Sequence, residues 1–176
     1  MPNPGLKIST IKQGEFRVSK SSEDRFLCVL GSCIATCFFD PVARVGGMNH
    51  FLLPGRDPAA TGEVKYGAHA MEQLVNALLR SGASRTRLQV SLFGGAKVIK
   101  SGGSIGANNA QFARDFVTSE RFHLHDVDVG GTHGRRLSFS PATGATKVEI
   151  LHNDAVLQRQ TMAPPQPRQN GSIELF

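Results

Sequence analysis

Apolar residues recur along the chain with two periods, and each period predicts a different kind of element. In residues 66–80 and 108–120 they return every three or four positions, as on one face of an α-helix, and Gly82 ends the first of these helices. Alternation of apolar and polar residues predicts strands over residues 8–18, 33–39, 45–53, 88–92, 122–129, 136–140 and 147–151. Two long helices among more numerous strands predict an α+β fold.

The segment from residue 30 to residue 54 predicts a β-hairpin that folds back at Asp40-Pro41. A turn with two central residues places Cys33 directly opposite His50, whereas a turn with four central residues makes His50 its diagonal neighbour. Both registers keep the two side chains on one face of the hairpin, with Cβ atoms about 5 Å apart in the first case and roughly 7–8 Å apart in the second. Only a one-residue bulge would separate them.

A cysteine and a histidine on one face are the groups that a cysteine nucleophile requires. The imidazole of His50 can take the proton of the Cys33 thiol, and the resulting thiolate attacks carbonyl carbons. Gly31 and Ser32 allow a tight turn whose backbone N–H groups face a developing oxyanion. Two neighbours of the histidine are expected at the rim that receives the substrate: Asn49 and Phe51. The alternative from spacing alone is a buried apolar cysteine and a hydrogen-bonded histidine without a catalytic role.

These residues resemble the signature of a known family, the chemoreceptor glutamine deamidases of bacterial chemotaxis called CheD. The likeness includes Leu-Gly-Ser-Cys ending at Cys33, Asp-Pro at residues 40–41, Gly-Gly-Met-Asn-His-Phe across residues 46–51, and the seventeen-residue gap from the cysteine to His50. Further matching blocks lie at residues 66–83, 92–97, 105–109, 128–131 and 134–136. The likeness covers about residues 14–151, and several ordered blocks are more specific than one short motif.

The resemblance implies an enzyme that converts glutamine side chains of chemoreceptors to glutamate, with Cys33 as nucleophile, His50 as general base and acid, and no metal or cofactor. It also implies layered mixed β-sheets with helices packed outside, similar to the cysteine hydrolases that include toxin deamidases. The implied partners are the cytoplasmic domain of methyl-accepting chemoreceptors and a CheC-type chemotaxis phosphatase. One position departs from the family, whose members carry a threonine five or six residues before the cysteine that helps to hold the histidine. Here those positions are Cys28 and Leu27.

Length and composition place the chain among single-domain globular proteins. Its 176 residues, 40% of them hydrophobic, suit one domain over residues 1–160, followed by a flexible, proline-rich tail over residues 161–176. The sequence has no apolar run long enough for a membrane span and no apolar core of a signal peptide, so we expect a cytoplasmic protein without membrane insertion. Its three cysteines are then expected to be free thiols.

The formal net charge of +6 favours acidic partners without identifying them. Nucleic acid is not expected as a partner, because the basic residues are scattered and the chain has no tryptophan and one tyrosine for base stacking. His123, His125 and His133 do not complete the ligand set of a zinc site, so we expect these histidines to face solvent. Two rival functions stay open: a non-catalytic chemotaxis regulator that binds a CheC-type phosphatase, and a cysteine hydrolase that acts on another amide.

Overall fold

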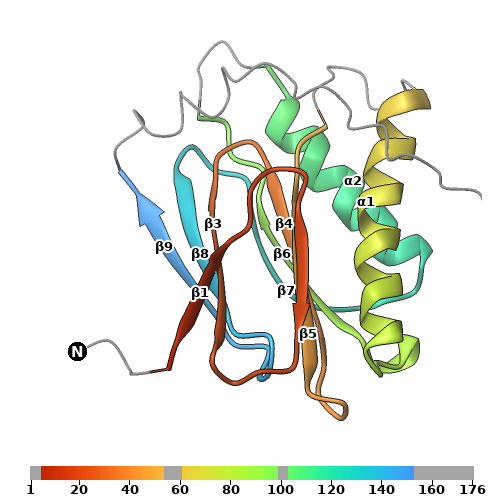
Figure 1. Cartoon of the computed structure of the whole chain (residues 1–176). Coiled ribbons are helices and arrows are strands. Elements are labelled where there is room, and N and C mark those ends of the chain that lie inside the picture. The colour runs from red at the N-terminus through yellow and green to blue at the C-terminus, as the bar shows by residue number, and fades with distance from the viewer. Residues whose placement is uncertain (1–4, 54–60, 99–102, 153–176) are drawn as a thin grey trace, which may run out of the picture.

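Two mixed β-sheets lie face to face, and two helices cover the outer face of the larger sheet (Figure 1). The structure is a computed structural model that describes residues 5–53, 61–98 and 103–152. In chain order the elements are β1 (Lys7–Thr10), β2 (Phe16–Ser19), β3 (Asp24–Leu30), β4 (Ile34–Asp40), β5 (Val45–Phe51), α1 (Thr61–Arg80), η1 (Arg85–Arg87), β6 (Gln89–Gly94), α2 (Ile105–Ser119), β7 (His123–Val129), β8 (Gly134–Phe139) and β9 (Thr146–Leu151).

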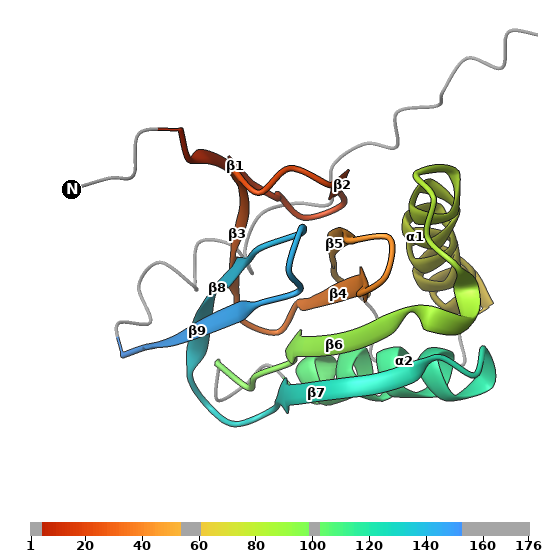
Figure 2. The same ribbon diagram turned by 90° about the horizontal axis from the view of Figure 1, so that it is seen from below.

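The strands form two separate sheets, and the helices add a third layer. The smaller sheet has the order β1-β3-β8-β9 and the larger sheet the order β2-β5-β4-β6-β7. Each sheet has one parallel pair, β1 with β3 and β6 with β7, among antiparallel pairs. Figure 2 shows both helices on the side of the larger sheet that points away from the smaller one. The predicted α+β class, with layered mixed sheets and helices outside, is confirmed.

The central strands of the larger sheet are buried on both faces, and this divides the apolar core in two. Because successive side chains of a strand point to opposite faces, Ala35 and Cys37 of β4 contact the smaller sheet, whereas Ile34 and Phe38 contact the helices. The predicted apolar stripe of α1 fills the helix-side core with Met71, Leu74, Val75 and Leu78. The hairpin that carries the predicted catalytic residues therefore runs through the middle of the molecule.

Asp40 fixes the register of the hairpin formed by β4 and β5. Its carboxylate accepts hydrogen bonds from two backbone N–H groups of the turn, at 2.9 and 3.0 Å, and from the guanidinium of Arg87. Burial raises the pKa of Asp40, but these hydrogen bonds outweigh burial and hold it well below its usual range. Asp40 pairs with Val45 and Ala35 with His50, so the turn has four central residues. Of the two predicted registers, the second is the one that forms.

The first thirty residues differ most from the predicted pattern. The sequence predicts one edge strand over residues 8–18, whereas the structure has two short strands, β1 and β2, that pair with different sheets. A turn over residues 12–15 separates them. The prediction also lacks β3, although Phe26, Cys28 and Leu30 alternate there as buried residues. This arrangement brings residues 11–15 beside β5.

Several remaining expectations concern surfaces and ends. The predicted exposure of His123, His125 and His133 is confirmed. Both predicted helices form, and each begins earlier than the apolar periodicity indicates. Among the helices of the described ranges, none is long and apolar enough to cross a bilayer. The predicted domain end at residue 160 and the predicted tail lie outside the described residues.

Candidate active site

Cys33 lies where the chain passes from the smaller sheet to the larger one, between β3 and β4. Three hydrogen bonds hold the backbone of this crossing: Gly95 N–H to the carbonyl oxygen of Cys33 at 2.8 Å, Ala96 N–H to that of Gly31 at 2.9 Å, and Asn109 Nδ2 to that of Ser32 at 3.1 Å. A Cβ atom at Gly94, whose φ is +110°, would lie 2.1 Å from the carbonyl oxygen of Cys33. Gly94, the last residue of β6, therefore allows a close backbone approach.

The thiol of Cys33 is almost enclosed, with 4% of the residue exposed. Burial raises the pKa of this thiol to about 12, although hydrogen bonding by its own backbone N–H lowers it. Burial likewise raises the pKa of Cys28 to about 12. In the free protein Cys33 is therefore a neutral thiol, and the sulfur becomes a nucleophile only when a base takes its proton during attack.

His50 lies on the same face of the hairpin as Cys33. It is paired with Ala35, and Cys33 and Ala35 both belong to the core between the two sheets. Because side chains two residues apart share a face, the register places Cys33 and His50 as diagonal neighbours. The geometric half of the sequence hypothesis, one shared face, is confirmed.

The hydrogen bonds of His50 define which ring nitrogen can act as a base. Nδ1 lies 2.9 Å from the carbonyl oxygen of Ile11, and a carbonyl only accepts, so Nδ1 carries the proton. Nε2 is buried, and within the described residues it has no hydrogen-bond partner. Burial lowers the pKa of His50, although the contact with Ile11 and the charge of Glu15 raise it, so the imidazole is neutral at pH 7. Its lone pair is then on Nε2, ready to accept a proton.

The carbonyl of Ile11 fixes the orientation of the His50 ring, and the side chains of Cys28 and Leu27 do not. Cys28 lies in the inter-sheet core with 1% exposed, and the carbonyl oxygen of Leu27 accepts a hydrogen bond from Ile11 N–H at 2.8 Å. Leu27 therefore contributes through its backbone, by anchoring Ile11, the residue whose carbonyl contacts His50. A sequence pattern cannot reveal the carbonyl of Ile11 as a partner of His50, because every residue has a carbonyl. Only the pairing of β1 with β3 directs this carbonyl toward the His50 ring.

The turn over residues 12–15 wraps around His50 and reaches Cys33. Gly14 N–H donates to the carbonyl oxygen of His50 at 2.7 Å, and His50 N–H donates to that of Glu15 at 3.1 Å. From the same turn, the side-chain oxygen of Gln13 lies 3.6 Å from Cys33 Sγ. The sequence pattern predicts an edge strand for this segment and gives no signal for Gln13, which contacts the predicted nucleophile.

Asn49 and Phe51 are not rim residues, which corrects the sequence expectation. They flank His50 on β5 and therefore point to the opposite face, toward the helices. Asn49 is 2% exposed, and its side-chain oxygen accepts a hydrogen bond from the hydroxyl of Thr36. Phe51 is fully buried in the helix-side core. Tyr66 of α1 is the better-placed neighbour, because its hydroxyl lies 3.9 Å from the point that a Cβ atom would occupy at Gly14.

Asn109 of α2 ties the two halves of the site together. Its side chain is fully buried, donates to the carbonyl oxygen of Ser32 at 3.1 Å and accepts from Leu53 N–H at 2.8 Å. Ser32 directly precedes the nucleophile, and Leu53 lies three residues beyond the histidine. One amide therefore fixes the distance between the segments that carry Cys33 and His50.

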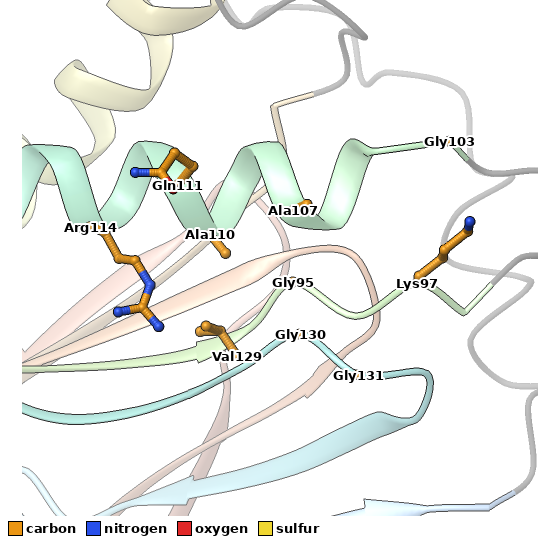
Figure 3. Close-up of a pocket in the computed structure, with 10 residues that line it drawn as sticks. All are labelled: Gly95, Lys97, Gly103, Ala107, Ala110, Gln111, Arg114, Val129, Gly130 and Gly131. Carbon is orange, nitrogen blue, oxygen red and sulfur yellow. The ribbon is translucent and has the colours of Figure 1, made fainter.

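A separate groove lies between α2 and the ends of β6 and β7 (Figure 3). It has a volume of about 330 Å³, and Lys97 and Arg114 are its charged lining residues. Neither Cys33 nor His50 lines it, so the groove is not the place where the thiol would meet a substrate. In the part of the chain that the structure describes, no three His, Cys, Asp or Glu side chains cluster as metal ligands.

Comparison with known proteins gives one consistent family. Residues 52–150 match the family described as CheD chemotactic sensory transduction. A protein of Jannaschia sp. named "Probable chemoreceptor glutamine deamidase CheD" is 49% identical over 149 residues, which cover 85% of each chain. Proteins with the same name from Zymomonas mobilis and Rhizobium leguminosarum are 44% and 42% identical, and cover 90% and 94% of this chain and 88% and 94% of their own length.

Proposed function

Because this chain belongs to the CheD family, whose curated members are named chemoreceptor glutamine deamidases, we propose that it hydrolyses glutamine side chains of methyl-accepting chemoreceptors to glutamate and releases ammonia. The observation that carries this proposal is the state of His50. Its Nδ1–H is committed to the carbonyl of Ile11, and among the described residues its Nε2 has no hydrogen-bond partner and lies on the face that also carries Cys33. A histidine with only a packing role would leave no reason for an unpaired buried nitrogen.

In the first half of the proposed reaction, Cys33 Sγ forms a bond to the carboxamide carbon of the substrate glutamine. The thiol proton passes to His50 Nε2, and the electron pair of the C=O bond moves to the oxygen. We propose that the backbone N–H groups of Cys33 and Ser32 donate to this oxyanion, with Gly31 supporting the turn. His50 then returns the proton to the leaving nitrogen, and ammonia departs from a thioester.

In the second half, water replaces ammonia. His50 Nε2 takes a proton from the water as its oxygen attacks the thioester carbon, the C–S bond then breaks, and His50 gives that proton to the departing sulfur, which leaves a glutamate side chain and the neutral thiol. Each group returns to its starting state, and the sequence of steps uses no metal or cofactor. A neutral thiol and a neutral imidazole are the expected resting pair, because burial disfavours the charged form of both.

The site geometry weighs against one of the two rival functions, the non-catalytic regulator. A non-catalytic regulator gained support from the missing family threonine, but the carbonyl of Ile11 supplies the contact that the threonine would make. We propose that the protein also binds a CheC-type phosphatase, in addition to its catalytic activity. We further propose that the reaction takes place in the cytoplasm, where the receptor modification region lies. The net charge of +6 suits a receptor region rich in glutamate.

The test is mass spectrometry of a receptor cytoplasmic fragment before and after incubation with the protein. Each deamidation replaces an amide by an acid and adds about one dalton, and we expect Cys33→Ala to abolish this change because the covalent step is lost. Cys37→Ala is the matched control, since Cys37 is a buried thiol on the same face of β4 and should be dispensable for the chemistry. Deamidation by Cys33→Ala at the wild-type rate, or its absence with the wild-type protein, would refute the proposal.

A further inference from the structure

We propose that Gln13 is a catalytic residue whose side-chain amide donates a hydrogen bond first to the Cys33 thiolate and then to the oxyanion of the tetrahedral intermediate. This inference rests on the proposed function and adds a donor that neither the family signature nor the hairpin indicates. Among the described residues, Gln13 supplies the side-chain amide that contacts the nucleophilic sulfur, at 3.6 Å between Oε1 and Sγ. That length suits a hydrogen bond to sulfur.

The backbone under Gln13 is held in place by the histidine that would act as base. Gly14 N–H and the carbonyl of Glu15 bind the backbone of His50 at 2.7 and 3.1 Å. The turn is closed by Glu15 N–H to the carbonyl of Lys12 at 2.9 Å, and by Lys12 N–H to the carboxylate of Glu15 at 2.9 Å. The backbone of Gln13 is therefore held in place next to both reacting groups. This is the preorganisation that an electrostatic catalyst needs.

The contact changes its direction when the sulfur loses its proton. In the free protein the thiol donates to Oε1, which is the arrangement that the structure records. A thiolate can only accept, so the amide must rotate about its last side-chain bond and present Nε2 instead. That rotation meets little resistance, because Gln13 is exposed and the terminal torsion of glutamine has broad minima. The new bond is charge-assisted and therefore stronger than the one that it replaces.

The same rotated amide fits the next step. When Sγ bonds to the substrate carbon, negative charge moves from sulfur to the substrate oxygen, which is then two bonds away from the sulfur. The backbone N–H of Cys33 is the donor already proposed for this oxygen, so Nε2 of Gln13 would add a side-chain donor to a backbone donor. Amide side chains serve in this role in other acyl-transfer sites, and loss of one such donor lowers kcat by about 10²–10³.

Three substitutions at Gln13 distinguish a catalytic donor from a side chain that only occupies the place of the substrate amide or only shapes the turn. Gln13→Met keeps the length of the side chain without a donor, Gln13→Glu keeps its shape as an acceptor, and Gln13→Ala removes it. We expect all three to lower kcat for deamidation of a receptor fragment, by about 10²–10³ for the methionine and alanine variants and by at least as much for the glutamate variant, with KM near the wild-type value. Gln73→Met and Gln73→Glu, on the exposed face of α1, are the matched controls and should leave kcat unchanged.

Opposite results would point to a different role. If Gln13 only occupies the place of the substrate amide, Gln13→Ala raises kcat/KM, and if it only shapes the turn, the variants lower the melting temperature and leave kcat unchanged. Either result overturns the proposal.

A second measurement does not depend on the receptor. Iodoacetamide should label Cys33 more slowly in Gln13→Met than in the wild type at a fixed alkaline pH, because the thiolate has lost a donor, while Cys28 and Cys37 in the same sample report any general loosening. Unchanged or faster labelling of Cys33 overturns the proposal, and this readout stands even where the receptor assay shows no deamidation at all.

Discussion

Replacement of Asn109 by leucine tests whether one buried amide holds the catalytic segments together. The side chain is fully buried and makes two hydrogen bonds to backbone groups, at 2.8 Å from Leu53 N–H and at 3.1 Å to the carbonyl oxygen of Ser32. Leucine has a similar size but leaves both groups buried without a partner. Each such group costs about 1–3 kcal/mol, so we expect Asn109→Leu to lower the free energy of unfolding by about 2–6 kcal/mol. Asn109→Asp keeps the acceptor for Leu53 but buries a carboxylate against the carbonyl oxygen of Ser32, so its loss should be at least as large as that of the leucine variant.

The assay is urea unfolding of each variant, together with kcat for deamidation at a temperature where the variant is folded. Loss of the bridge also frees Ser32 to move relative to β5, and a misplacement of about 1 Å at a reacting group can cost a factor of about 10² in rate. Asn76→Leu and Asn76→Asp, on the exposed face of α1, are the matched controls and should stay within about 0.5 kcal/mol of the wild type. If Asn109→Leu also stays within that limit and keeps its kcat, the bridge has neither of the roles that we assign to it.

Four further outcomes follow from the structure. Asp40→Asn should lower the free energy of unfolding in urea by roughly 1.5–3 kcal/mol, because its hydrogen bonds to the turn and to a guanidinium are charged; an unchanged midpoint would contradict this. The pH profile of kcat/KM should fall only on the acid side with a midpoint below 6.5, since burial lowers the pKa of His50 and the neutral ring is the base; a midpoint above 6.5 would show a different base. Gly94→Ala should fail to fold or lose activity, as judged by circular dichroism and kcat, because the new Cβ would lie 2.1 Å from the Cys33 carbonyl oxygen; wild-type behaviour would exclude that close approach. Cys28→Thr should lower the melting temperature without raising kcat, because it buries a hydroxyl in the core while another group already holds the histidine; a faster enzyme would mean that the histidine lacks a restraint.

The same-face relation of Cys33 and His50 could be predicted from the sequence because it depends only on the period of a strand. With either turn length compatible with Asp40-Pro41, His50 lies directly opposite Cys33 or two residues along the strand from that position. Side chains two residues apart share a face, so either register places both on one face. The choice between the registers could not be predicted, since it depends on the buried carboxylate of Asp40 and on Arg87, forty-seven residues away in the chain. The family signature and the α+β class were likewise local properties, carried by short blocks and by the two apolar periods.

The surroundings of the two residues were decided by the tertiary structure. Ile11 and Gln13 reach the site because β1 and β2 join different sheets, and neither a carbonyl nor an exposed glutamine gives a pattern in sequence. Asn49 stands next to His50 in the chain, but it is buried because α1 covers the opposite face of β5, a contact between distant segments. Asn109 connects Ser32 to Leu53, two residues beyond the strand of His50, from a helix more than fifty residues further along the chain. Strand periodicity acts over a few residues and sets the faces, whereas the burial of a group and its hydrogen-bond partners depend on segments that only the folded chain brings together.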